Sequence, residues 1–243
     1  MDFFDWKNYF EGNRNHFMDI DWKTVFLIPE EERKTITSSI QQFQKGESSE
    51  GRHLFSFAKR FPDPLYLECI RLFICEEQKH ASVLGCFMDK QGIKRIQKHW
   101  VDDVFRWLRK LAGIENTLIV LLTAEIISAV YYKALMLASS SKLLQKICTQ
   151  ILRDEDQHIS FQCYTLSKLY SAKNFFSRFW NRTWHLVLMT GTIGVVWFYH
   201  RKVLKTGAYS FSKFFRENFQ IYYEADRKIK NTIATGKESF QAL

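Results

Sequence analysis

Residues 75–80 read CEEQKH and residues 153–158 read RDEDQH, each within strongly apolar surroundings. In both stretches a histidine follows a glutamate by three residues, and the pairs are Glu77 with His80 and Glu155 with His158. Residues three apart lie on the same face of an α-helix, so the two side chains of each pair can reach one cation. Apolar residues continue the same face in both directions, which predicts two long amphipathic helices.

The composition of the chain favours a helical fold. Its 243 residues are enough for one substantial domain with an appendage. Hydrophobic residues make up 46% and aromatic residues 16%, so a large core can form and disorder is not expected. All-β folds need more turn residues than the 10 Gly and 3 Pro found here. We therefore expect an all-α protein.

Four long helices are expected, each with a glutamate in the middle of its inward stripe. The first covers residues 32–60, carries Glu47 and Glu50 on that stripe, and ends before Pro62 because proline cannot continue the helical ladder. The others are expected at residues 65–90, 114–138 and 142–172, with an amphipathic connector at 97–112.

The four helices form two matching halves. Thirty residues separate Glu47 from Glu77, and thirty also separate Glu125 from Glu155. This repeat predicts two helical hairpins related by a pseudo-twofold axis. In each antiparallel hairpin the two glutamates come to the same level.

The predicted site combines four carboxylates and two imidazoles, a set that suits two carboxylate-bridged iron or manganese ions. Burying four bare carboxylates would be strongly disfavoured, and two divalent cations cancel that charge. One ion is expected on Glu47, Glu77 and His80, and the other on Glu125, Glu155 and His158. The glutamate of each Glu-x-x-His pair is expected to bridge the two ions.

Over residues 34–171 this pattern resembles the ferritin-like di-iron carboxylate superfamily. Gly46–Glu47 is similar to the start of the first ligand helix in rubrerythrins and in the di-iron hydroxylases of ubiquinone synthesis, although rubredoxin-type cysteines are absent from the sequence. The resemblance implies a ferritin-like four-helix bundle over residues 34–171 and leaves both ends outside. From the sequence itself, residues 1–33 are expected to wrap the domain as short helices, and residues 172–243 to form a C-terminal helical extension. The resemblance also implies two Fe ions, with Mn or a mixed Fe/Mn pair as alternatives.

Several neighbouring residues leave alternatives open. Glu50 is the alternative to Glu47 as first ligand, and the equal spacing favours Glu47. Glu76 and Asp154 each precede a ligand glutamate. In bacterial multicomponent monooxygenases, acids at such positions orient the histidine ligands, whereas the alternative here is an ordinary surface acid. Tyr132 faces inward, where it either borders a substrate cavity or fills core, and we favour core.

The resemblance implies a di-iron oxidoreductase, an oxidase or monooxygenase that uses O₂ on a small or lipid-like organic substrate. Its electron donor is not identified by the sequence. The alternatives are a ferroxidase or peroxide-scavenging iron-handling protein, and a non-catalytic, metal-stabilised bundle that binds a partner. A homodimer is compatible with each function. Nucleic-acid binding is not expected, because no basic helix stripe with interleaved aromatics stands out.

The C-terminal third contains an apolar run, Trp184–Tyr199, with Arg178, Arg182, Arg201 and Lys202 around it. At about 16 residues it falls short of the roughly 20 that span a bilayer. The run is therefore expected to pack across the bundle, with contact in the membrane plane and a true span as alternatives. The net charge of +9 is compatible with an anionic membrane surface. Five cysteines and no signal peptide favour the cytoplasm, with peripheral membrane attachment as the variant.

Overall fold

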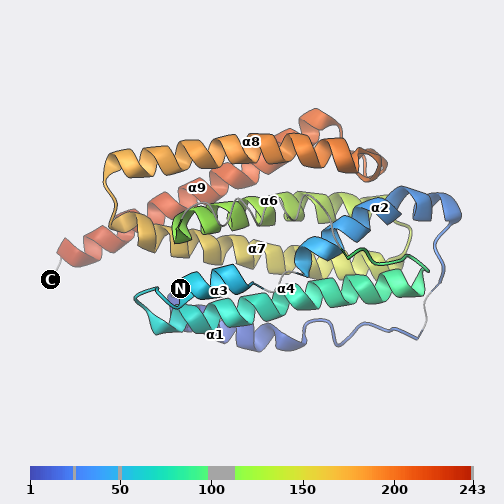
Figure 1. Ribbon diagram of the computed structural model, residues 1–243, viewed down its shortest axis with the longest axis horizontal. Coiled ribbons are helices and arrows are strands. Elements are labelled where there is room, and N and C mark those ends of the chain that lie inside the picture. Colours follow the sequence, from blue (N-terminus) through green and yellow to red (C-terminus); the bar gives the residue numbers. More distant parts are fainter. Residues whose placement is uncertain (24–25, 49–50, 98–112, 242–243) are drawn as a thin grey trace.

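The computed structural model describes residues 1–23, 26–48, 51–97 and 113–241, and the regular elements within them are all helical (Figure 1). The prediction of an all-α protein is confirmed. The elements are α1 (Phe3–Gly12), a 3₁₀ turn η1 (Asn13–Asn15), α2 (Glu30–Glu47), α3 (Arg52–Ala58), α4 (Pro64–Lys90), α6 (Ile114–Ala138), α7 (Lys142–Ser171), α8 (Phe175–Thr206) and α9 (Phe211–Gln241).

The predicted second, third and fourth helices agree with α4, α6 and α7 to within one residue. Local signals set these bounds. The side chain of Asp63 accepts a hydrogen bond from the backbone of Leu65, and Pro64 occupies the first position of α4, where a missing N–H costs nothing. At α7 the Ser141 hydroxyl accepts from the backbone N–H of Leu144.

The prediction of one continuous first helix over residues 32–60 is wrong. The chain forms α2 and α3 instead, and Gly51 between them has a φ of +60°. That left-handed conformation suits glycine, and a Cβ atom at Gly51 would lie 2.4 Å from Cδ1 of Ile74. The alternative ligand Glu50 and nearly all of the connector predicted at 97–112 lie outside the described residues.

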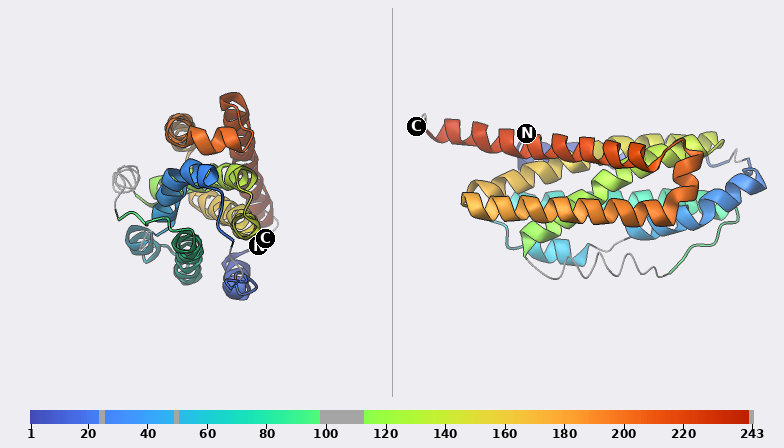
Figure 2. Two further views of the ribbon diagram at one scale, coloured as in Figure 1. Left: turned by 90° about the vertical axis from the view of Figure 1, so that its right-hand side faces the viewer. Right: turned by 90° about the horizontal axis from the view of Figure 1, so that it is seen from above.

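The four helices α2, α4, α6 and α7 lie side by side, with α4 and α6 running opposite to α7 (Figures 1 and 2). Helix α1 packs on α4, as expected of an N-terminal segment that wraps the domain in short helices. On the other side of the molecule, α8 packs on α6 and α9 packs on α7. Helix α1 on one side, and α8 and α9 on the other, therefore cover the central helices (Figure 2).

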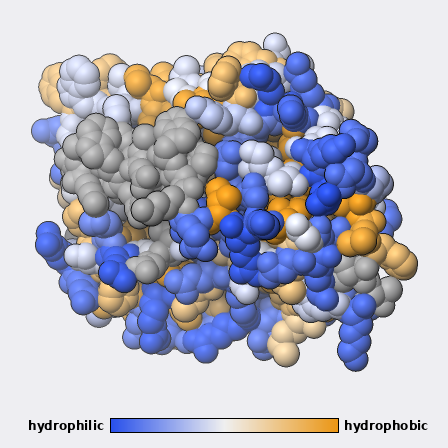
Figure 3. Space-filling model, turned by 45° about the vertical axis from the view of Figure 1, so that its right-hand side comes forward, coloured by the Kyte–Doolittle hydropathy of each residue, from blue (hydrophilic) through white to orange (hydrophobic). Residues whose placement is uncertain are grey.

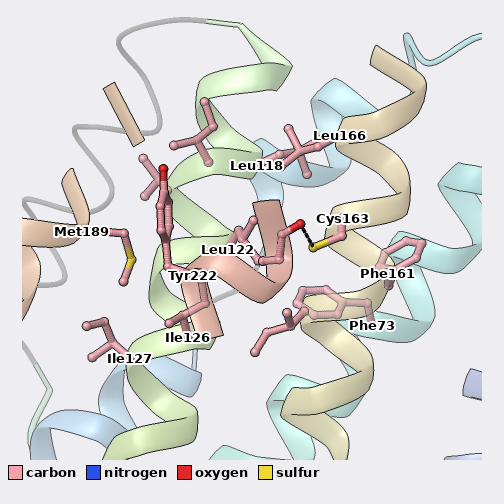
Figure 4. Packing of buried hydrophobic residues seen from close by; sticks show 14 of the residues in the cluster. Phe73, Leu118, Leu122, Ile126, Ile127, Phe161, Cys163, Leu166, Met189 and Tyr222 are labelled. Carbon is pink, nitrogen blue, oxygen red and sulfur yellow. Dashed lines mark hydrogen bonds between the residues drawn. The ribbon is translucent and has the colours of Figure 1, made fainter. Parts of the chain in front are cut away.

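Helix α6 lies at the centre of the core. Figure 4 shows its Leu118, Leu122 and Ile126 facing the neighbouring helices. Phe161 of α7 and Met189 of α8 belong to the same buried cluster. Among the described residues, α6 is the helix long and apolar enough to cross a membrane, but 72% of its apolar window is buried inside the fold. That degree of burial is typical of a core helix in a packed protein.

Candidate metal centre

The six predicted ligands meet between four helices, where α2 supplies Glu47, α6 supplies Glu125, and α4 and α7 each supply a Glu-x-x-His pair. Their ligand atoms form two sets, and within each set all atoms lie within 4.8 Å of one another. Glu77 and Glu155 belong to both sets, which places two candidate cation sites next to each other. The first set is Glu47, Glu77, His80 and Glu155, and the second is Glu77, Glu125, Glu155 and His158.

The ligand atoms are buried and lack ordinary partners. His80, Glu155 and His158 are fully buried, and Glu77 keeps 16% of its side chain exposed. Both carboxylate oxygens of Glu155, Oε1 of Glu77, and Nδ1 of both histidines have no hydrogen-bond partner among the described residues. Buried polar groups are nearly always hydrogen-bonded, so this concentration of exceptions needs an explanation.

The unpartnered atoms converge instead of pointing apart. Nδ1 of His158 lies 3.0 Å from Oε1 of Glu77 and 3.5 Å from Oε2 of Glu125, but makes no hydrogen bond. Carboxylate oxygens and imidazole nitrogens around a common point are the donor set that divalent iron and manganese accept. The residues present therefore fit a pair of divalent cations.

The pKa values of the carboxyls show how unfavourable the cluster is without cations. Burial, followed by the charge of Glu77, raises the pKa of Glu47 well above its ordinary value. Burial and the charge of Glu125 do the same to Glu155, and they also raise the pKa of Glu77. Burial acts in the same direction on Glu125, but its contacts with Glu155 and His158 outweigh burial and lower its pKa.

The cluster also shifts the pKa of His158. Burial acts to lower this pKa, but the surrounding carboxylates outweigh burial and raise it well above the ordinary value. Those carboxylates are Glu125, Glu155, Glu76 and Glu77. Protonation thus takes the place that a bound cation would fill, since both supply positive charge to the same carboxylates.

Glu76 and Asp154 lie beside the histidines, each next to the histidine of the other helix. Oδ2 of Asp154 lies 3.0 Å from Nε2 of His80, and Oε1 of Glu76 lies 3.4 Å from Nε2 of His158. Both acids are buried, so they are not ordinary surface acids. The His80 contact is a hydrogen bond, and it leaves Nδ1 of that ring for the cluster, whereas Nε2 of His158 makes no hydrogen bond with the described residues. That these acids orient the histidines stays a prediction.

Asn13 connects these two acids, and sequence reasoning missed it. Its amide nitrogen donates 2.9 Å hydrogen bonds to Oε1 of Glu76 and to Oδ1 of Asp154. His16 follows closely, with Nε2 3.4 Å from Oδ2 of Asp154. The polar stretch NRNH within an aromatic segment was the available signal. The N-terminal segment thus reaches the centre as well as wrapping the domain.

Two further buried polar side chains lie on the helices that carry candidate ligands, Tyr132 on α6 and Gln162 on α7. The Tyr132 hydroxyl donates a 2.7 Å hydrogen bond to Oε1 of Glu47, so this residue does more than fill core. Burial and the charge of Glu47 raise the pKa of Tyr132 well above its ordinary value, which keeps it protonated as a donor. Gln162 follows His158 by one helical turn, is fully buried, and has no partner for either amide atom among the described residues.

Changing Asn13 to alanine should weaken metal binding without unfolding the protein. The change leaves Glu76 without its amide donor and removes one of the donors to Asp154. Loss of such supporting contacts typically costs about 10- to 100-fold in metal affinity. Competition with a chromogenic chelator measures that affinity. The control is Asn15→Ala at an exposed position, and equal affinities in the two variants would contradict the supporting role of Asn13.

Comparison with known proteins gives no relative from which a function could be transferred. No family model matches the chain, and neither a curated protein nor a solved structure matches it.

Proposed function

We propose that α2, α4, α6 and α7 form a ferritin-like four-helix bundle that holds two Fe ions, with Mn or a mixed Fe/Mn pair as alternatives. One observation carries this proposal: two buried sets of ligand atoms share Glu77 and Glu155, and most of the atoms have no other partner. Bundle proteins that bind two iron ions use this combination of four glutamates and two histidines.

We further propose that the protein is an oxidoreductase that uses O₂ to oxidise or hydroxylate an organic substrate. Two reduced iron ions, when bound, supply the electrons for reductive activation of dioxygen. The chain contributes a water-poor enclosure, because Phe73 packs against His158 with ring centroids 4.7 Å apart, and Phe17 packs against His80 at 5.9 Å. Such an enclosure protects reactive species from side reactions with water.

The buried amide of Gln162 supports the proposal that the substrate is small or lipid-like and carries one polar group. This amide lies one helical turn from His158, on the face of α7 that carries Glu155, and both amide atoms lack partners among the described residues. An unsatisfied buried amide is destabilising unless a ligand completes its hydrogen bonds. We assign Gln162 to the substrate's polar group, and the surrounding apolar residues to the rest of the substrate.

Anaerobic loading with ferrous ion, followed by one addition of O₂, tests this function. We expect two irons per chain, their oxidation seen as a new absorbance band, and a return to the starting spectrum when a chemical reductant is added. Uptake and oxidation of iron well beyond two per chain would instead indicate a ferroxidase. No reaction with O₂ would leave a non-catalytic bundle.

The control for this experiment is a protein with His80→Ala and His158→Ala together. Each set then loses its imidazole, so neither absorbance band nor stoichiometric iron is expected. Circular dichroism shows whether the variant keeps its helices. A wild-type response in this variant would place the iron elsewhere in the chain and refute the proposal.

A further inference from the structure

Helix α8 has two apolar faces, and the fold covers one of them. Leu188, Met189 and Ile193 lie on the covered face, where α8 packs against α6. The outer face exposes large apolar side chains spaced as neighbouring turns of one helix require. They include Phe176 (72% exposed), Trp180 (66%), Val187 (58%) and Phe198 (62%). The expectation that the apolar run would be hidden across the bundle therefore holds for the inner face alone.

The outward direction of this face is fixed by a buried polar contact. Nδ1 of His200 lies 2.8 Å from the Ser39 hydroxyl of α2, and the same hydroxyl donates a 2.9 Å hydrogen bond to Tyr131 of α6. Rotation of α8 that buried its outer aromatics would break this contact. Helix α8 also lies on the side of the molecule opposite α1 and α4 (Figure 2). The exposed face is thus a feature of the folded protein.

Cationic residues lie at both ends of α8, and most of them are in its last two turns. Between Asp156 and Glu217 the sequence contains no acidic residue. Near the end of α8 the guanidinium of Arg201 lies 5.0 Å from the centre of the Phe198 ring. Hydrophobic residues are visible along the upper edge of the molecule, towards α8, above a largely hydrophilic face (Figure 3). The cations of α8 are Arg178, Arg182, Arg201, Lys202 and Lys205, of which Arg182 is paired with Asp226 of α9 at 2.8 Å.

We propose that this outer face of α8 docks on an anionic membrane surface, with the helix lying in the membrane plane. A helix with exposed tryptophan and phenylalanine between cationic ends matches the headgroup region, where apolar rings enter the acyl boundary and cations meet anionic lipids. A second copy of the chain is a poorer occupant, because two acid-free, cationic helices would face each other. The proposal does not depend on the metal centre.

Co-sedimentation of the full-length protein with lipid vesicles tests the docking surface. We expect the protein to sediment with vesicles containing phosphatidylglycerol at low salt, and much less with vesicles of phosphatidylcholine alone. The combined change Arg201→Gln, Lys202→Gln and Lys205→Gln should lower the partition coefficient on anionic vesicles about a hundredfold, because each cation contributes about a factor of five. High salt should produce a similar loss.

An aromatic variant separates this surface from nonspecific binding. Phe176→Ser, Trp180→Ser and Phe198→Ser together should release the protein from anionic vesicles, whereas Phe26→Ser should not. Phe26 is 81% exposed and lies outside α8, so this control removes one exposed aromatic side chain without touching the surface. The thermal unfolding midpoint and metal content, measured on the same samples, show that each variant is folded.

Two results would overturn the docking surface. One is wild-type protein that stays in the supernatant with anionic vesicles at low salt. The other is a wild-type dimer in light scattering that the aromatic variant converts to a monomer, which would assign the face to a second copy. Because vesicle binding is measured with chelator as well as with metal, a failure here leaves the proposed metal centre untouched, and the reverse also holds.

Discussion

Replacing Glu155 by glutamine is expected to empty both cation sites, whereas replacing Glu47 by glutamine is expected to empty one. Glu155 supplies ligand atoms to both sets, and Glu47 supplies them to the first set alone. An amide removes the negative charge with little change in shape, so the effect reports on ligation instead of packing. Elemental analysis after desalting should give two ions per chain for the wild type, none for Glu155→Gln and one for Glu47→Gln.

The matched control is Asp156→Asn, on the neighbouring residue of α7. Asp156 is exposed, and loss of its charge should leave two ions per chain. Glu125→Gln should behave like Glu47→Gln, because Glu125 belongs to the second set alone. If Glu155→Gln keeps both ions, or if Glu47→Gln loses both, the two sets do not share ligands as described and the assignment of the centre is wrong.

The grouping of the six candidate ligands could be predicted because helical geometry determines most of their positions. Within α4 and α7, a separation of three residues is enough to bring glutamate and histidine to one face. Equal spacing in the two halves then pointed to Glu47 and Glu125 on the partner helices, and the structure brings both into the cluster. Such predictions need no knowledge of the loop conformations. In two antiparallel neighbouring helices, the residue spacing sets how far along the bundle axis each side chain lies.

The break between α2 and α3 could not be predicted in the same way. The helical spacing of the inward stripe continues through Glu47 and Glu50, between Phe43 and Leu54, so spacing alone predicted a continuous helix across the polar stretch QKGESSEGRH at residues 44–53. Helix α2 ends at Glu47, and α3 begins after Gly51, whose left-handed backbone suits glycine and is not encoded in hydrophobic periodicity. The alternative ligand Glu50 lies outside the described residues, so its role stays a prediction.

Contacts between residues far apart in the sequence could not be predicted from the hydrophobic pattern either. Asn13 is 63 residues from Glu76 and 141 residues from Asp154, and no local spacing links them. The acids were found from their places beside the ligand glutamates, but the sequence did not show that each lies next to the histidine of the other helix. The grouping of the six candidate ligands is therefore predictable from local spacing, whereas their contacts with residues far away in the sequence are not.

Removal of the metal should lower the thermal unfolding midpoint by about 15–30 °C. A cation at a thousandfold excess over its dissociation constant stabilises the folded state by about 4 kcal/mol, and two sites double that value. In a chain of this size, each kcal/mol shifts the midpoint by about 2–4 °C. Circular dichroism with metal and with chelator measures the difference. A midpoint that does not respond to chelator would contradict a di-metal centre in the core.

The change Glu155→Met is expected to reverse its effect on stability when the metal is removed. With metal, the variant loses a shared ligand and should unfold at a lower temperature than the wild type. With chelator, it should unfold at a higher temperature, because both oxygens of the fully buried Glu155 lack hydrogen-bond partners and their removal relieves about 1–3 kcal/mol. Asp156→Met, at the exposed neighbour, should show no such reversal. A carboxyl that stabilised the fold by itself would make Glu155→Met destabilising under both conditions. That result would mean that the core tolerates the cluster without cations, and it would remove the physical reason for placing two of them there.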